Sequence, residues 1–313
     1  MATIAERGAE RNAQYSAHFR NLITTGRNHT YTTAEATRAQ LARQIGLHYT
    51  PGPVAPLTIA GSSAEFDVQI DGGLAMPAKM SAAPNPRGIV IGLHGYGGSP
   101  DTVLSNIDPG TKGFGATLLD MGFSVVAPQL TCSYPGFGAD RNHLDRLAQL
   151  TGFSLLGFEI MCLMRLADSL HHHGLPIYVC GFSQGALTAL HFGALDQRLA
   201  GVASCSWFCN RERKLLSPEW WSYASAEEYD KFNPFAAPLW PDYLLGMLCY
   251  PRPLLITSGD VDYGRPLADV QSEFALIDSF YQANGAGGQA QLHIGQGEHE
   301  VFLEAVINFF SAF

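Results

Sequence analysis

The feature that most constrains the fold is the pentapeptide GFSQG at residues 181–185, together with the runs on either side of it. Residues 177–180 are apolar and typical of a buried strand, whereas residues 186–190 are typical of a helix. Ser183 is therefore expected at the tip of a sharp turn from strand to helix. Glycines two positions before and after it let strand and helix approach closely and leave the hydroxyl exposed. A serine held in this way is a candidate nucleophile, although the glycines could also serve only a tight turn.

Strand-like and helix-like runs alternate along most of the chain. Strands are expected over residues 87–93, 123–128, 177–180, 199–206, 253–258 and 289–294. Helices are expected over residues 111–121, 266–284 and 301–313, and a long helix is expected to lie within 142–173. This alternation predicts an α/β fold with a mostly parallel central sheet and helices on both faces.

The first part of the chain has a different pattern, and we expect residues 1–55 to form an N-terminal helical extension. Thr33 is placed to cap a helix over residues 34–47, and a Pro-Gly-Pro break follows at 51–53. The α/β domain then spans residues 56–313. It opens with short antiparallel strands near 57–60, 65–70 and 74–79, joined by turns at 61–63 and 71–73. Three roles are open for this extension: covering the core, bordering a pocket, or mediating self-association. Because of the third, a homo-oligomer stays an open expectation.

Residues 207–252 are too long for an ordinary connection, and we expect an insertion or cap there. All 4 tryptophans of the chain lie in this segment. An aromatic insertion beside the carboxyl ends of the strands is suited to forming a pocket wall, so Trp207 and Trp221 are candidate substrate-binding residues. The alternative is that these aromatic residues only pack the insertion onto the domain.

A catalytic serine needs a histidine and an acid. The strand at 253–258 is followed by Asp260 and Asp262; Asp262 fits a loop position, while Asp260 fits a turn or capping role. His299 lies in a glycine-rich loop before the last helix, whereas its rival His293 lies within a strand. The sequence therefore predicts Ser183, Asp262 and His299 as catalytic residues, in the chain order Ser, Asp, His.

An oxyanion hole needs backbone N–H groups aimed at the developing negative charge. One is expected from Gln184, directly after the serine and at the start of a helix. The other is expected from Tyr96 in the glycine-rich loop after the strand at 87–93. His94 is expected to hold this loop by hydrogen bonds.

Composition limits the partners. The formal net charge is −9, only 15% of the residues are charged, and there is no basic run, so nucleic acid is not an expected partner. No apolar stretch approaches the ~20 residues of a membrane span, and the first residues do not read as a secretory signal. The 6 cysteines are expected to be free thiols of a cytoplasmic protein. The histidines at 171–173 point in different directions on a helix and are not expected to bind a metal.

Several of these stretches together resemble the α/β-hydrolase superfamily over about residues 56–313, and in particular its dienelactone hydrolase and acetyl xylan esterase-like branch. The matching stretches are residues 93–98 (LHGYGG), 155–166, 181–185 (GFSQG), 250–256 (YPRPLLI), 259–262 (GDVD) and 298–300 (EHE). The resemblance implies a triad of Ser183, His299 and Asp262, an oxyanion hole of the Tyr96 and Gln184 amides, and no metal or organic cofactor. Glu298, directly before the histidine, departs from the glycine usual in the family.

These observations predict a serine esterase that cleaves a small-molecule carboxylic ester through an acyl-enzyme. Acyl transfer and peptide or amide hydrolysis are the alternatives that use the same triad. A non-catalytic binding protein on the same fold is a third class, which the complete set of Ser, Asp and His disfavours. The sequence does not indicate the acyl or the alcohol half of the substrate.

Overall fold

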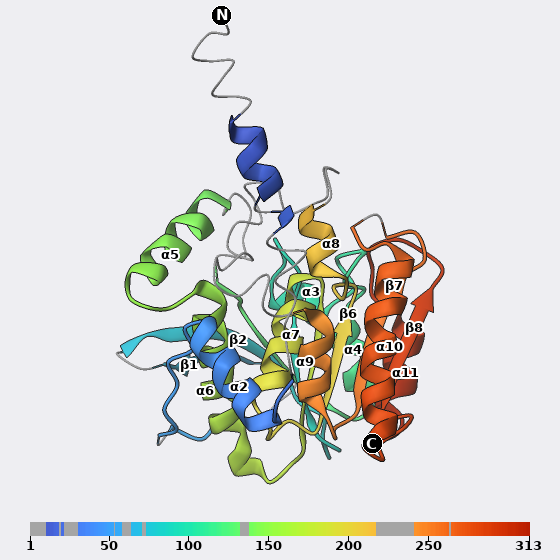
Figure 1. The fold of residues 1–313 in the computed structure, drawn as a ribbon. Coiled ribbons are helices and arrows are strands. Elements are labelled where there is room, and N and C mark those ends of the chain that lie inside the picture. The colour runs from blue at the N-terminus through green and yellow to red at the C-terminus, as the bar shows by residue number, and fades with distance from the viewer. Residues whose placement is uncertain are drawn as a thin grey trace, which may run out of the picture.

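The central feature of the computed structural model is one mixed β-sheet, which the helices cover on both faces (Figure 1). The structure describes residues 11–18, 20–21, 31–52, 54–57, 64–70, 73–131, 138–216, 241–262 and 264–313. Within these ranges, eight strands form the sheet in the order β1-β2-β4-β3-β5-β6-β7-β8. They are β1 (Ala64–Gln69), β2 (Ala75–Ser81), β3 (Ile89–Leu93), β4 (Ser124–Pro128), β5 (Ile177–Phe182), β6 (Gly201–Cys205), β7 (Leu254–Gly259) and β8 (Ala290–Gly295).

The six strands β3 to β8 pair in parallel with one another, whereas β1 and β2 are antiparallel to their neighbours. Every residue of β3, β4, β5 and β6 is buried, as expected for parallel strands covered on both sides. The predicted fold class is therefore confirmed. All the carboxyl ends of the parallel strands lie at one edge of the sheet, where α/β proteins place their functional groups.

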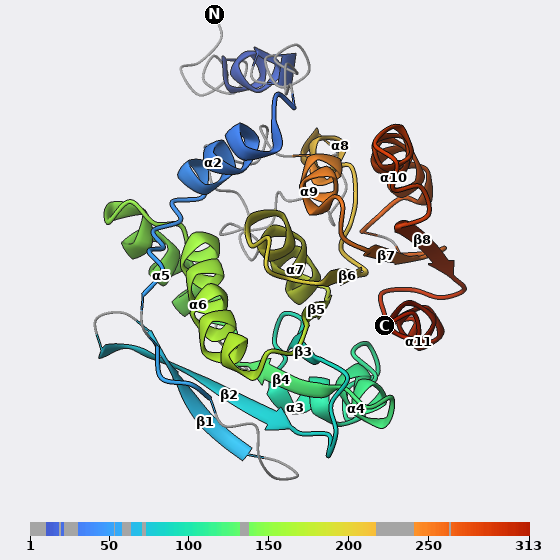
Figure 2. The same cartoon turned by 90° about the horizontal axis from the view of Figure 1, so that it is seen from below.

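The helices form two layers, one on each face of the sheet (Figure 2). They are α2 (Ala34–Gln44), α3 (Pro100–Leu104), α4 (Phe114–Asp120), α5 (Gly138–Leu150), α6 (Leu155–Leu170), α7 (Gln184–Leu195), α8 (Arg211–Leu216), α9 (Asp242–Cys249), α10 (Leu267–Ala283) and α11 (Leu303–Phe310). Residues from α2, α6, α7, α9 and α10 form one apolar cluster with the sheet, and residues from α3, α4 and α11 form another. The sheet thus separates two cores.

The long helix expected within residues 142–173 is present as α6, and the shorter helix α5 precedes it. The chain bends by 88° at the break between α5 and α6. Gly152 adopts a positive φ of 85°, which ends α5, and the Ser154 side chain caps α6 by accepting a hydrogen bond from Gly157 N at 3.0 Å. In the part of the chain that the structure describes, no single helix is long and apolar enough to span a membrane. Only α5 and α6 taken together reach that length and apolar composition, and they are sharply bent relative to each other.

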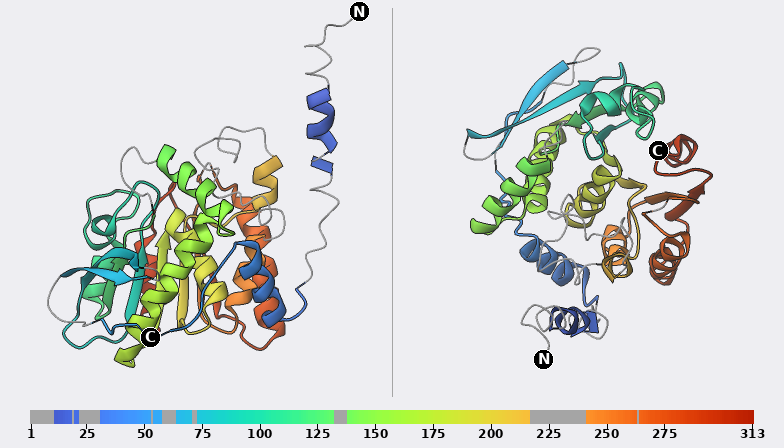
Figure 3. Two further views of the ribbon diagram at one scale, coloured as in Figure 1. Left: turned by 90° about the vertical axis from the view of Figure 1, so that its left-hand side faces the viewer. Right: turned by 90° about the horizontal axis from the view of Figure 1, so that it is seen from above.

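The helix expected over residues 34–47 is present as α2, which ends at Gln44. Thr33 caps it as expected, and its side chain accepts a hydrogen bond from Ala36 N at 3.2 Å. Leu41 is fully buried against the core, and Arg38 donates to the carbonyl oxygens of Ala194 and Leu248. This part of the N-terminal segment therefore covers α7 and α9 (Figure 3). The expected strand near 57–60 and the turn at 61–63 lie largely outside the described residues.

The segment 207–252 is described only at its two ends, and residues 217–240 lie outside the described ranges. Its α9 packs against α7 and α10, so this helix belongs to the layer that covers the sheet and forms the crossover from β6 to β7. The boundaries of the expected domain and insertion stay predictions.

Candidate active site

Ser183 lies at a strained turn between β5 and α7. Its backbone has φ 53° and ψ −117°, a conformation that costs energy for a residue with a side chain, and its N–H donates to Cys205 O at 2.9 Å. A Cβ atom on Gly181 would clash with the backbone of Gly185. Because only glycine permits this approach, strand and helix meet closely enough to hold the serine at the tip.

The structure brings the three predicted residues into one hydrogen-bonded chain. His299 Nε2 lies 2.8 Å from Ser183 Oγ, and His299 Nδ1 lies 2.9 Å from Asp262 Oδ2. Asp262 follows β7 and His299 follows β8, so each comes from the carboxyl end of a parallel strand. Residues far apart in sequence thus meet at the functional edge of the sheet.

The two other candidates make different contacts. Asp260 accepts a hydrogen bond from Gly297 N at 2.9 Å and so holds the loop that leads to the histidine. His293 lies in β8, and its Nε2 is 3.2 Å from a carboxylate oxygen of Glu304. Neither contributes to the chain that ends at Ser183.

The electrostatics keep the acid ionised and the base neutral. Burial raises the pKa of Asp262, but the hydrogen bond with His299 and the charge of Arg265 outweigh it and lower this pKa to about 2. Burial and the charge of Arg265 lower the pKa of His299 below its ordinary value, against the opposing effect of Asp262. A neutral imidazole can accept a proton from the serine hydroxyl.

The two segments expected to form the oxyanion hole lie next to the serine. Gln184 is the first residue of α7, so its N–H is one of the free donors of a helix N-terminus. A Cβ on Gly95 would lie 3.4 Å from Ser183 Cβ, which places the loop that contains Tyr96 against the nucleophile. Tyr96 itself is 38% exposed.

His94 supports this loop. It is fully buried, its Nε2 accepts from Leu130 N at 3.1 Å, and its Nδ1 therefore carries the proton donated to Gly95 O at 2.9 Å. Burial is the main reason that its pKa falls to about 4. The neutral ring joins the end of β4 to the loop after β3.

Two buried arginines beside the site were not predicted from the sequence. Arg141 of α5 pairs with Glu159 at 3.0 Å, and in the amide orientation that satisfies both groups its Nη2 donates to the side-chain oxygen of Gln184 at 2.6 Å. Arg265 contacts both Asp262 and His299. Arg265 follows Asp262 by three residues in the same loop, which is the signal that sequence reasoning overlooked; Arg141 had none.

Of the two candidate substrate-binding tryptophans, the structure describes only Trp207. Trp207 is 2% exposed, and the cationic groups of Arg265 and Lys214 lie 5.3 and 5.6 Å from the centre of its ring. It supports the Arg265 side chain in this structure, and its contact with substrate stays a prediction. Trp221 lies outside the described residues.

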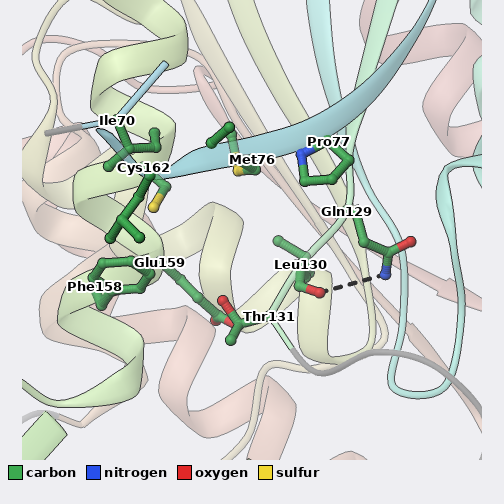
Figure 4. Close-up of a pocket in the computed structure, with 11 residues that line it drawn as sticks. Ile70, Met76, Pro77, Gln129, Leu130, Thr131, Phe158, Glu159 and Cys162 are labelled. Atoms are coloured by element: carbon green, nitrogen blue, oxygen red, sulfur yellow. Dashed lines mark hydrogen bonds between the residues drawn. The ribbon is translucent and has the colours of Figure 1, made fainter. Parts of the chain in front are cut away.

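A cavity of about 360 Å³ lies between β2, the segment that follows β4 and the first turns of α6 (Figure 4). Its wall is mainly apolar, and it is lined by Ile70, Leu74, Ala75, Met76, Pro77, Gln129, Leu130, Thr131, Phe158, Glu159 and Cys162. Two contacts join it to the oxyanion segments: Leu130 N donates to His94, and Glu159 pairs with the arginine that contacts Gln184.

Among the described residues, no group of three or more His, Cys, Asp or Glu side chains is arranged to hold a metal ion. His173 of the histidine run instead contacts the carbonyl oxygen of Leu57, at 2.5 Å from its Nε2.

Comparison with solved structures identifies the fold. The sequence matches no protein-family model and no curated protein. Among solved structures, a protein described as an acetyl xylan esterase from Bacteroides fragilis is similar with a TM-score of 0.64 and 15% identity, over 84% of this chain and 74% of that one. A glucuronoyl esterase from Caldicellulosiruptor kristjansonii has a TM-score of 0.60 and 19% identity, over 88% and 82%. A glucuronoyl esterase from Solibacter usitatus has 0.55 and 14%, over 88% and 91%. The chain therefore has the α/β-hydrolase fold.

Proposed function

We propose that this protein is a serine hydrolase that cleaves small-molecule carboxylic esters through an acyl-enzyme. The observation that carries the proposal is the continuous hydrogen-bonded chain from Ser183 through His299 to Asp262. Two further facts support it. The serine lies at a strained turn at the start of α7 and close to Gly95 of the loop after β3, and the similar structures named above are described as esterases.

The reaction begins with attack of Ser183 Oγ on the ester carbonyl carbon. His299 Nε2 accepts the hydroxyl proton as the C–O bond forms, and Asp262 stabilises the imidazolium that results. The carbonyl oxygen becomes an oxyanion, for which the N–H groups of Gln184 and Tyr96 are the proposed donors. His299 then returns the proton to the departing alcohol, and the acyl group stays on Ser183.

Water completes the cycle by the same steps. His299 removes a proton from a water molecule, whose oxygen attacks the acyl carbon, and a second oxyanion forms. Collapse of this intermediate releases the carboxylic acid, while Ser183 recovers its proton from His299. The lowered pKa of His299 favours this role, because the base must be neutral at the start of both acylation and deacylation.

The cavity beside Leu130 is the proposed site for an apolar part of the ester. Its apolar wall favours hydrocarbon over charged groups, and its volume suits a group of several carbons. Its contacts with the oxyanion segments support this assignment.

The test is hydrolysis of p-nitrophenyl esters, from acetate to decanoate, by the wild type and by Ser183→Ala. We expect kcat to fall by about 10⁴ or more in the variant, with Ser169→Ala, a buried serine on α6, close to wild type. Retained activity in Ser183→Ala would contradict the proposal. Product analysis with added alcohols separates hydrolysis from the acyl-transfer alternative, because a transferase would form a new ester.

A further inference from the structure

Arg265 makes contacts that tie it to both the acid and the base of the proposed triad. Its Nη1 lies 3.2 Å from each oxygen of Asp262 and 3.1 Å from His299 Nδ1. Its Nε donates to Trp207 O at 3.0 Å, and its guanidinium lies over the Trp207 ring. The side chain is only 8% exposed, so little water screens its charge.

These contacts leave His299 Nδ1 between a donor and an acceptor. If Nδ1 carried a lone pair, it would face the lone pairs of Asp262 Oδ2 at 2.9 Å, and the proton on Nε2 would point at Ser183. A histidine in that state cannot accept the serine proton. If Nδ1 carries the proton, it donates to Asp262 Oδ2, while Arg265 donates from Nη1 to the carboxylate and from Nε to Trp207 O. The second arrangement satisfies more groups and has the base in its active tautomer.

We infer that Arg265 is a positioning residue that fixes the ionised Asp262 and, through its buried positive charge, opposes protonation of His299, so that activity extends to lower pH. This inference rests on the proposed function. A carboxylate alone would favour the imidazolium, because opposite charges attract. The guanidinium offsets this attraction while leaving the hydrogen bond between Asp262 and His299 in place.

Other charges around His299 act in both directions. Lys214, from α8, also lowers its pKa. On the loop of His299 itself, Glu298 and Glu300 are acidic, and Glu300 pairs with Lys112. Arg265 differs from all of these because it touches the imidazole nitrogen directly.

The test is the pKa of His299 itself, measured by NMR on the full chain with ¹⁵N-labelled histidine and assigned with His299→Gln. Arg265→Gln removes the charge but keeps an N–H donor, and it should raise this pKa by about one unit. Arg265→Lys keeps the charge and should retain most of the depression. Arg198→Met, which breaks ion pairs with Asp168 and Asp196 away from the triad, should leave the pKa unchanged.

Activity gives a second reading of the same effect. The acid limb of kcat/KM should move up with the pKa in Arg265→Gln, since that limb reports the free enzyme's base. A purely structural role would lower activity at every pH without moving the limb.

An unchanged pKa in Arg265→Gln, or an equal rise in Arg265→Lys, would overturn the inference. Should Arg265→Gln fail to fold, Arg265→Met takes its place, because it also removes the charge: a raised pKa of His299 supports the inference, and an unchanged pKa contradicts it. Because these readings need no substrate, a lack of esterase activity would refute the proposed function and leave this result standing.

Discussion

Gly185 lies so close to His94 that a Cβ atom on the glycine would be 2.5 Å from the histidine's carbonyl oxygen. The first turn of α7 therefore packs directly on the end of β3, and this contact places the nucleophile beside the oxyanion loop. We expect Gly185→Ala to force the two segments apart and to lower the free energy of unfolding by about 1–3 kcal/mol. Ester hydrolysis should fall with it, because both oxyanion donors move.

The control is Gly287→Ala, whose new Cβ would meet Gln282 at an ordinary 3.5 Å on the surface. Urea denaturation and ester hydrolysis of both variants check the prediction. Equal stability and activity in Gly185→Ala and the control would contradict it.

Asp262 and Asp260 should respond differently to the same substitution. Asp262→Asn leaves the shape intact but replaces the acceptor for His299 Nδ1–H by an amide that can donate, which favours the wrong tautomer. We expect kcat to fall by a factor on the order of 10³–10⁴. Asp260→Asn keeps an oxygen that can accept from Gly297 N, and its kcat should stay within about tenfold of wild type. Similar losses in the two variants would show that Asp262 has no special role.

Two buried neutral histidines should make the fold sensitive to acid. Burial, joined by nearby arginine charge, lowers the pKa of His94 to about 4 and of His191 to about 3. The unfolded chain takes up these protons near pH 6.5, whereas the folded chain does not, so stability is complete above that pH and falls as the pH drops toward 4 and 3. Each histidine contributes a slope of about 1.4 kcal/mol per pH unit.

Urea midpoints measured at pH 8, 7, 6 and 5 check this acid sensitivity. They should be similar at the first two values and should decline at the last two, and His191→Gln should reduce the decline. A midpoint that is constant down to pH 5 would be inconsistent with buried neutral histidines.

The cavity predicts a preference among esters. Cys162 lines it and is 5% exposed, so Cys162→Phe should fill much of the space. Hydrolysis of the acetate ester should change little, while kcat/KM for the hexanoate ester should fall by tenfold or more, on the order of two buried CH₂ groups. An unchanged ratio between the two esters would place the acyl chain elsewhere.

The sequence predicted the sheet well because its strands are continuous apolar runs between glycine and proline signals. The GFSQG turn was also predictable, because Gly181 packs against the backbone of Gly185, and Gly185 packs against the backbone of Leu93 and His94. The shorter helix α5 was not predicted as a separate element, although Gly152 marks its end and the Ser154 side chain caps the start of α6. Tertiary contacts decided the rest: nothing local to Arg141 indicates that it reaches Gln184, 43 positions later in the chain.

The most direct test of the account is covalent labelling of the intact protein with a fluorophosphonate, followed by mass spectrometry of the peptides. The reagent requires an activated serine but no knowledge of the natural ester. The account predicts one adduct on Ser183, none on Ser183→Ala, and much slower labelling of His299→Gln. An absence of labelling in the wild type, or an adduct on a different serine, would contradict the assignment of Ser183 as the nucleophile.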